Sequence, residues 1–127
     1  MVVLANILSS IKNAEKSGKY EVTVRPVSNV VKKILGILKE LHYIKDAEFI
    51  ENRKGGEVKI KLTGKINSIG EITPNFYVGV RDLRKFEKRY LPADGFGNFI
   101  LSTPKGVITN TKAKELNTGG QLLAYVY

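Results

Sequence analysis

Short hydroxyl side chains and glycines gather at two places in the last third of this 127-residue chain. The first is Ser102-Thr103-Pro104-Lys105-Gly106, and the second is Thr118-Gly119-Gly120-Gln121. Hydroxyls donate and accept hydrogen bonds, an ammonium group can hold an anion, and glycine lets backbone N–H groups come close to a ligand. These residues could therefore bind a polar or anionic partner. Ser, Thr, Pro and Gly are also ordinary turn residues, so the pattern alone leaves both interpretations open.

The segments around these two places predict a small rigid unit. The apolar run 99–101 precedes the first, and the apolar run 122–127 follows the second. A short polar helix is expected between them, opening at Thr109-Asn110-Thr111 and stopping near Asn117. The order strand, hydroxyl loop, short helix, Gly-Gly and strand would hold the polar groups in fixed positions on one rim.

The region before this unit is expected to be rich in β-structure from Ile66 onward, with its strands broken at residues 73–75. Asp82 is expected to cap a short helix that runs to Tyr90. The outward side of that helix would carry the densest basic cluster of the chain, Arg84, Lys85, Lys88 and Arg89. Such a cluster is either a solvated helix face or a phosphate contact.

The first half of the chain predicts the order helix, strand, helix, strand, strand over residues 1–64. Apolar residues recur at helical spacing in 4–11 and 30–41, and alternate with polar ones in 20–24. Ser28 is expected to cap the second helix, and Gly36 inside it to allow close packing against the sheet. We expect an α+β fold: this α-β-α-β-β unit, packed beside a β-rich unit with short helices over residues 65–127.

Three basic residues of the first half are candidate phosphate contacts. Arg53 and Lys54 lie at the tip of the turn joining the strands 44–50 and 58–62, where Gly55-Gly56 suits a hairpin. Lys12 lies on the polar side of the first helix. A solvated turn and a solvated helix face are the competing interpretations.

Charge is the most informative bulk property. The chain has 21 Lys and Arg against 12 Asp and Glu, which gives a net charge of +9. Such a balance favours a polyanionic partner, nucleic acid first and an anionic membrane second, although a basic chain can also be merely soluble. No apolar run approaches the roughly 20 residues of a membrane span.

No enzyme or metal site is expected. The chain has no cysteine and one histidine, His42, which makes a zinc site or a triad improbable on composition. Gly95-Phe96-Gly97 lacks the Gly-Lys-Ser/Thr ending of a P-loop and the third glycine of a dinucleotide fingerprint. We expect no catalytic residue, no metal ligand and no cofactor.

Several of these stretches together resemble the small-subunit ribosomal protein eight family. In the second half they are Phe96-Gly97, Ser102 to Thr109, Ala113 and Gly119 to Tyr127. The first half is similar through residues 11–14, 26–28 and 36–39. Residues 86–92 and the Leu-Ala-Tyr-Val-Tyr ending look more like the archaeal branch than the bacterial one.

The resemblance implies a protein that binds the central domain of small-subunit rRNA directly and early in assembly, at an irregular helix with an internal loop. The hydroxyl loop of the family carries over onto Ser102 and Thr103, and its glycines onto Gly106, Gly119 and Gly120. Lys105, Thr118 and Gln121 flank these residues. Pro104 stands where the family usually has a second serine, and Gln121 stands where bacterial members often have glutamate. Tyr77 is a weak match for the aromatic residue that stacks on RNA in bacterial members.

The resemblance also implies other small-subunit ribosomal proteins as partners, no membrane, a monomer when free, and a place on the cytoplasmic ribosome. Bacterial members repress translation of their own operon by binding an mRNA mimic of the rRNA site, and one RNA site could serve both tasks. The alternative from another class is a basic protein-interaction or scaffold module whose charge only aids solubility.

Overall fold

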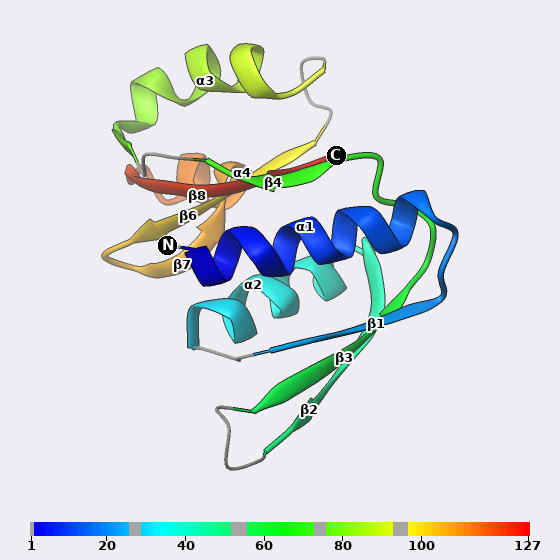
Figure 1. The fold of residues 1–127 in the computed structure, drawn as a ribbon. Helices are drawn as coiled ribbons and strands as arrows, with labels where there is room; N and C mark the ends of the chain where they lie inside the picture. Colours follow the sequence, from blue (N-terminus) through cyan, green and yellow to red (C-terminus); the bar gives the residue numbers. More distant parts are fainter. Residues whose placement is uncertain (1, 26–28, 52–55, 73–75, 93–96) are drawn as a thin grey trace. The chain divides into compact units, whose positions relative to one another are not determined.

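The computed structural model describes residues 2–25, 29–51, 56–72, 76–92 and 97–127, and it confirms the α+β class (Figure 1). The chain divides into two compact units, residues 1–69 and 70–127, each with its own antiparallel sheet. The boundary that the sequence suggests, after residue 64, falls between the strands Glu57–Leu62 and Ile69–Glu71. Ser28, Arg53, Lys54 and Gly95-Phe96 lie outside the described residues.

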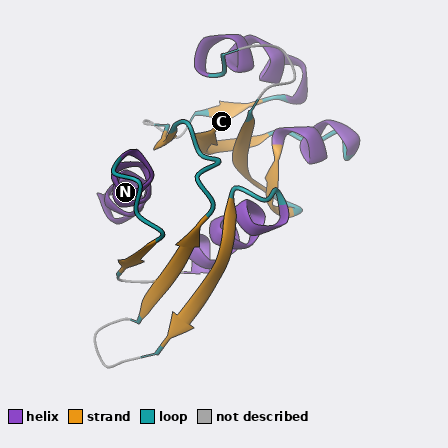
Figure 2. Ribbon diagram, turned by 90° about the vertical axis from the view of Figure 1, so that its right-hand side faces the viewer, coloured by secondary structure: helices purple, strands orange, loops and turns teal. Residues whose placement is uncertain are grey.

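The N-terminal unit has the expected order of two helices and three strands. These are α1 (Val2–Lys16), β1 (Glu21–Val24), α2 (Asn29–Glu40), β2 (Ile44–Ile50) and β3 (Glu57–Leu62). The strands form a three-stranded antiparallel sheet in the order β1-β3-β2, visible from two sides in Figures 1 and 2. Ile60 of the central strand lies opposite Val22 on one side and Ala47 on the other.

Apolar stripes of the two helices and of β3 are buried in this unit. The residues are Leu4, Ile7, Leu8 and Ile11 of α1, Val31, Ile34, Leu35 and Leu38 of α2, and Val58, Ile60 and Leu62 of β3. Each fully buried side chain of this kind contributes roughly 1.5–3 kcal/mol relative to exposure. The periodicity that predicted the helices is therefore the pattern that buries them.

The single histidine ends α2. His42 has a φ of 64°, its N–H donates to the Lys39 carbonyl at 3.0 Å, and the N–H of Tyr43 donates to the Leu38 carbonyl at 2.9 Å. These two bonds form the Schellman ending of a helix, a position that usually holds glycine, as Gly18 does after α1. The role of His42 in the fold is structural.

Gly36 does not have the role expected from the sequence. It is exposed on α2, and a Cβ added there would have no neighbour within 4 Å. The expectation of close packing against the sheet is wrong, because Gly36 lies on the side of the helix that the apolar stripe leaves exposed.

The C-terminal unit has eight elements. They are β4 (Ile69–Glu71), whose first residue is the last of the N-terminal unit, β5 (Tyr77–Val78), the 3₁₀ turn η1 (Val80–Asp82), α3 (Leu83–Tyr90), β6 (Asn98–Thr103), β7 (Gly106–Thr109), α4 (Asn110–Glu115) and β8 (Gly120–Val126). The sheet runs β4-β8-β6-β7, and β5 also pairs with β8. The sequence did not predict β7, which pairs with β6 and makes the hydroxyl loop the turn of a hairpin.

Both helices of this unit pack on the same face of its sheet. The apolar cluster there joins Phe99 and Leu101 of β6 and Leu122 of β8 to Leu83 of α3 and Ala113 of α4. Figure 1 shows α3 along that side of β8. Asp82 occupies the N-cap position of α3, but its side chain makes no capping hydrogen bond, so that expectation is wrong.

Among the helices of the described residues, none has the length and apolar character that a bilayer span requires.

Candidate nucleic-acid interface

Four residues on neighbouring strands form one row across the end of the C-terminal sheet. Gln121 of β8 lies opposite Tyr77 of β5 on one side and opposite Ser102 of β6 on the other. Ser102 in turn lies opposite Val107 of β7. Directly opposed residues of antiparallel strands project their side chains on the same face. We call Tyr77, Gln121, Ser102 and Val107 the Ser102 row.

The Ser102 row projects from the face opposite the apolar cluster. Successive side chains of a strand alternate between faces, and the neighbours Val78, Leu101 and Leu122 all belong to that cluster. The Tyr77 side chain is 69% exposed, Gln121 is exposed and Ser102 is half-buried. Within the described part of the chain, no side chain or backbone group bonds to the Ser102 hydroxyl or the Gln121 amide.

This arrangement combines uncharged hydrogen-bonding groups with an aromatic ring. A hydroxyl and a primary amide supply both donors and acceptors, so the row can match a partner that presents both. The exposed ring of Tyr77 can stack on a planar group such as a nucleobase. The strands fix the spacing of these groups, so the side chains are already in position before a partner binds.

Thr103, the residue after Ser102, is used differently. Its hydroxyl donates to the carbonyl of Gly106 at 2.8 Å and accepts from the N–H of Lys105 at 3.1 Å. Gly106 has a φ of 115°, which glycine adopts without strain. Thr103 and Gly106 thus close the β6–β7 turn, and Thr103 has no hydroxyl proton left to donate to a partner.

Lys105 extends from the same turn toward α4. Its Nζ donates to the carbonyl of Leu116, the C-cap residue of that helix, at 3.4 Å. A cation at a helix C-terminus is favourable because the last carbonyls are unpaired and carry partial negative charge. Lys105 is nevertheless exposed, and two ammonium protons remain for a phosphate.

Thr118 belongs to the end of α4. Its N–H donates to the carbonyl of Ala113 at 3.0 Å, and Asn117, with a φ of 51°, takes the left-handed position of a Schellman ending. The Thr118 hydroxyl donates to the Gly119 carbonyl at 3.2 Å. These bonds fix the start of β8.

Gly119 and Gly120 are required by packing within the unit. A Cβ added at Gly119 would come within 2.9 Å of Gly79 Cα, and one added at Gly120 within 2.7 Å of the Thr103 methyl carbon. Neither separation is tolerated by ordinary side chains. These close contacts account for both glycines within the fold, and a close approach of RNA to their backbone stays a prediction.

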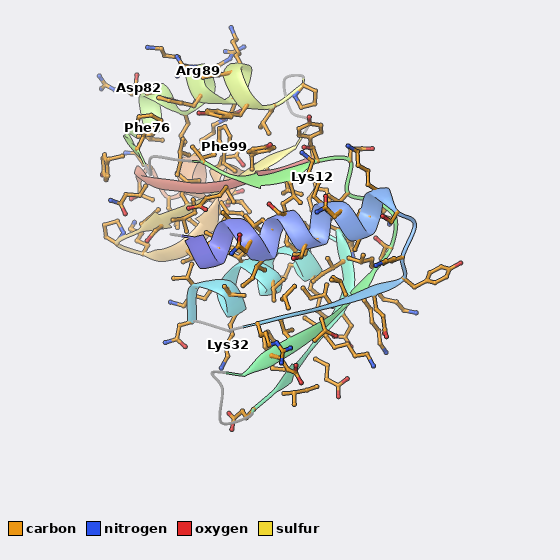
Figure 3. All side chains as sticks on the ribbon, in the orientation of Figure 1. Lys12, Lys32, Phe76, Asp82, Arg89 and Phe99 are labelled. Atoms are coloured by element: carbon orange, nitrogen blue, oxygen red, sulfur yellow. The ribbon has the colours of Figure 1, made fainter. Side chains whose placement is uncertain are left out.

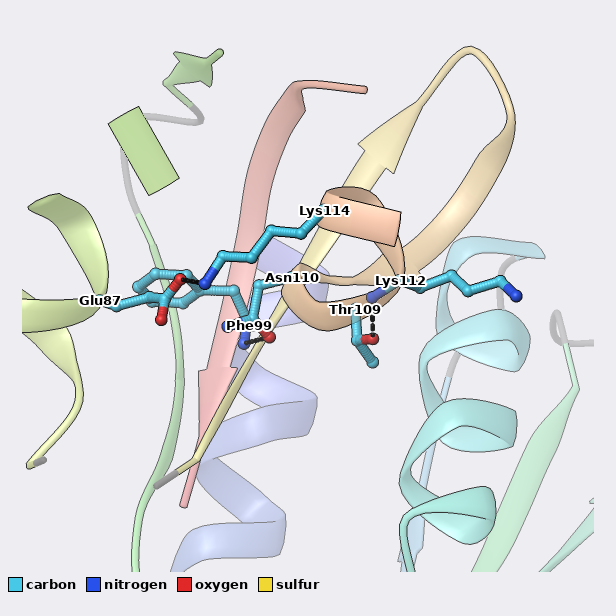
Figure 4. Close-up of polar contacts among 6 residues, drawn as sticks. All are labelled: Glu87, Phe99, Thr109, Asn110, Lys112 and Lys114. Atoms are coloured by element: carbon cyan, nitrogen blue, oxygen red, sulfur yellow. Dashed lines mark hydrogen bonds and ion pairs between the residues drawn. The ribbon is translucent and has the colours of Figure 1, made fainter. Parts of the chain in front are cut away.

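Polar contacts fix the start of α4 and connect the helix to β6 and α3 (Figure 4). The Thr109 hydroxyl accepts from the N–H of Lys112 at 3.2 Å, which caps the helix where the sequence predicted its start. Asn110 is 4% exposed, and its Oδ1 accepts from the N–H of Phe99 at 3.1 Å. Lys114 forms an ion pair with Glu87 of α3. Both helices are thereby tied to the sheet that carries the Ser102 row.

The structure separates the predicted site residues into three groups. Ser102 and Gln121 are brought together with Tyr77, which the sequence offered only as a weak match. Thr103, Lys105, Gly106, Thr118, Gly119 and Gly120 form the two loops that support this row. Lys12 lies on α1 of the N-terminal unit and is half-buried (Figure 3), while Arg53 and Lys54 are not described.

A separate cavity of about 300 Å³ opens in the N-terminal unit beyond the end of α1. It is lined by Glu15, Gly18, Lys19, Tyr20, Leu62, Thr63 and Gly64. Burial raises the pKa of the Glu15 carboxyl, and the N–H of Gly64, which donates to it at 3.3 Å, partly offsets that effect. Three or more His, Cys, Asp or Glu side chains placed to hold a metal ion do not occur among the described residues.

A net charge of +9 and a row of hydroxyl, amide and ring groups on one sheet are typical of a nucleic-acid-binding protein. The model of the family described as ribosomal protein S8 matches residues 3–127. The chain therefore belongs to the ribosomal protein S8 family, a family of structural, RNA-binding proteins. This confirms the resemblance found in the sequence and the expectation that the chain is not an enzyme.

Archaeal relatives match nearly the whole chain. It is 48% identical over 124 residues to small ribosomal subunit protein uS8 of Methanococcoides burtonii, covering 98% of this chain and 95% of the relative. Proteins of the same name from Thermoplasma acidophilum and Thermoplasma volcanium are 45% and 44% identical, each with 98% of this chain and 96% of the relative covered. The expected archaeal type is confirmed.

Proposed function

We propose that this protein is a constituent of the small ribosomal subunit in the cytoplasm, and that it binds the central domain of the rRNA through the Ser102 row. The observation that carries the proposal is the cross-strand placement of Tyr77, Gln121 and Ser102 side by side at one end of the sheet, with Tyr77 and Gln121 exposed and Ser102 half-buried. The family and the net charge of +9 supply the class of partner.

The chemistry of the row suits folded RNA. A-form RNA hides its base edges in a deep, narrow major groove and displays 2′-hydroxyls in a wide, shallow minor groove. The Ser102 hydroxyl and Gln121 amide can each donate to and accept from such groups. An unpaired base of an internal loop can stack on the Tyr77 ring, because bases outside a regular helix leave their faces available.

Basic residues outside the row would neutralise phosphates. Lys105 lies nearest in sequence to Ser102 and is exposed, and Lys12, Arg53 and Lys54 of the N-terminal unit are further candidates. Phosphate contacts position a protein on nucleic acid, while contacts to bases and 2′-hydroxyls distinguish one site from another. In this proposal the basic residues contribute affinity, and the Ser102 row contributes selectivity.

Two other functions remain as alternatives. Repression of translation through an mRNA that mimics the rRNA site would use the same row and is compatible with the main proposal. A scaffold module that binds other small-subunit proteins would need no RNA contact. A free monomer suits the main proposal, because the row requires residues of one chain only.

Chemical footprinting of the rRNA central domain, with and without the protein, tests the proposal. We expect protection of 2′-hydroxyls and bases at one irregular helix, lost on Ser102→Ala together with Gln121→Ala. The affinity for that RNA should fall steeply with salt and exceed the affinity for a random duplex of equal length. Uniform weak protection, identical in the variant, would contradict the proposal and favour the scaffold alternative.

A further inference from the structure

The outward side of α3 carries a concentrated positive charge. Arg84, Lys85, Lys88 and Arg89, which we call the α3 cationic face, are all exposed. The only acid in the helix, Glu87, forms its ion pair with Lys114 of α4 and has a side chain only 12% exposed. Among the described residues, neither Lys85 nor Lys88 forms an ion pair.

This concentration opposes the stability of the helix. Arg84 and Lys88 are four residues apart, as are Lys85 and Arg89, and like charges at that spacing repel one another on a helix surface. A partner with closely spaced negative charges would remove this repulsion. A phosphate backbone has that property.

The opposite side of α3 fixes the cationic face in position. Leu83 is fully buried, the Phe86 ring lies 6.0 Å from Phe76, and the Tyr90 ring lies 6.1 Å edge-on to Phe99 and 6.0 Å stacked on Tyr125. Figure 3 shows Phe99 between the strands and α3, and Arg89 on the side of α3 that faces away from the strands. The guanidinium carbon of Arg89 lies 5.3 Å from the centre of the Phe86 ring. The cations therefore stand on a rigid element of the C-terminal unit.

The α3 cationic face and the Ser102 row point in opposite directions. α3 packs on the face of the sheet that carries Phe99 and Leu101, whereas Ser102 projects from the other face. A helix with its side chains is about 10–12 Å across, so the sheet and at least that thickness separate the two surfaces. One straight RNA helix cannot touch both.

We propose that the α3 cationic face binds the phosphate backbone of a second RNA segment, so that the C-terminal unit bridges two segments of the folded rRNA. The inference rests on the proposed function and adds a separate contact to it. Protein interfaces usually centre on apolar side chains. The four outward residues of α3 are all basic and offer no apolar centre, so their surface fits the phosphates of RNA better than it fits an acidic protein.

Two variants of equal charge test this bridge. In the α3 variant, Arg84, Lys85, Lys88 and Arg89 are each changed to Gln, which keeps a good helix former at every position. In the control variant, the exposed Lys16, Lys19, Lys33 and Lys65 of the N-terminal unit are changed to Gln. Each RNA affinity is measured against salt for two probes: a short stem-loop with the irregular site alone, and the whole central domain.

We expect both variants to bind the stem-loop with the same small loss. The α3 variant alone should bind the whole domain at least about tenfold more weakly near 0.15 M salt, with the slope of log K against log salt smaller by roughly three to four. As a measurement on the unaltered protein, Lys85 and Lys88 should be protected from acetylation by the whole domain and not by the stem-loop.

The bridge would be overturned if the two variants had equal affinities for both RNAs and if the whole domain did not protect Lys85 and Lys88 from acetylation. The partner of the α3 cationic face would then be an acidic protein surface. In that case selective binding of the stem-loop by the unaltered protein would leave the proposed function standing. Absence of selective binding to either RNA would overturn the proposed function and the bridge together.

Discussion

The hydroxyl of Thr103 donates a 2.8 Å hydrogen bond to the carbonyl oxygen of Gly106 across the β6–β7 turn. Ser102, one residue earlier, projects from the opposite face of the same strand with its hydroxyl unbonded by any described residue. Adjacent hydroxyls thus have separate roles: one shapes the loop, and the other is available to a partner. Substituting both residues at once would change stability and binding together, so the two effects could not be separated.

Replacing Thr103 separates these roles. Thr103→Val keeps the shape of the side chain but removes both hydrogen bonds of the turn, each worth a net 0.5–1.5 kcal/mol, so we expect the free energy of unfolding to fall by about 1–3 kcal/mol. Thr103→Ser keeps the hydroxyl and serves as the control. Urea unfolding measures both. An equal loss in the two variants would mean that the methyl group, not the hydroxyl, matters.

Asn110 is the buried polar residue that ties α4 to β6. Asn110→Ala should lower the free energy of unfolding by about 1–3 kcal/mol, because the N–H of Phe99 would lose its acceptor in a buried place. Its neighbour Thr111 is exposed, and Thr111→Ala should change stability by less than about 0.5 kcal/mol. Thermal unfolding of the two variants tests this prediction. Similar midpoints for Asn110→Ala and Thr111→Ala would show that the Asn110 hydrogen bond contributes little to stability.

Gly36 offers a stabilising substitution. Because a Cβ at this exposed helical position meets no atom within 4 Å, Gly36→Ala should raise the free energy of unfolding by about 0.5–1 kcal/mol. Gly120→Ala should do the opposite, since its Cβ would be forced against the Thr103 methyl carbon. Denaturant midpoints of both variants give the test, and a destabilised Gly36→Ala would disprove the solvent-facing placement.

Glu15 should make stability depend on pH. Burial raises its pKa in the folded chain above the ordinary value of 4.5, so its charged form is less favourable folded than unfolded. Well below pH 4.5 the group is protonated in both states and has no effect; the destabilisation grows as pH rises above 4.5 and is complete once pH exceeds the folded pKa. Glu15→Gln retains an acceptor for Gly64 and should therefore stabilise the chain near pH 7 but not below about pH 4. An equal gain in stability at both pH values would show that the raised pKa of Glu15 is not the cause.

Local sequence patterns predicted most of the elements. The apolar stripe of residues 4–11 predicted α1, and the polar residues from Thr109 onward predicted the start of α4. Both signals act within a few residues, so they can be recognised in the sequence alone. β7 was missed, since Gly106–Thr109 is a strand only through its pairing with β6. Asp82 was expected to cap α3, yet the 3₁₀ turn before the helix leaves its side chain unbonded.

The candidate site was predicted in composition but not in arrangement. Which of Ser102 and Thr103 faces outward depends on strand register, which long-range pairing with β8 decides. For the same reason Tyr77, distant in sequence from Gln121, could not be placed beside it from the sequence alone. The only signal in the sequence was its aromatic character, which made it a weak match for the stacking residue of bacterial family members.

The most direct test of the account is the affinity of a row variant for the isolated irregular rRNA stem. Tyr77→Ala, Ser102→Ala and Gln121→Ala together remove one stacking platform and two hydrogen-bonding groups, and leave the turn bonds of Thr103 intact. A control with Tyr20→Ala, Ser17→Ala and Asn67→Ala removes similar exposed groups from the N-terminal unit.

We predict that the row variant binds at least about 30-fold more weakly, which corresponds to about 2 kcal/mol, while the control binds like the unaltered protein. Thermal unfolding should be unchanged in both. Equal affinities for the row variant and the unaltered protein would contradict the claim that the Ser102 row recognises RNA.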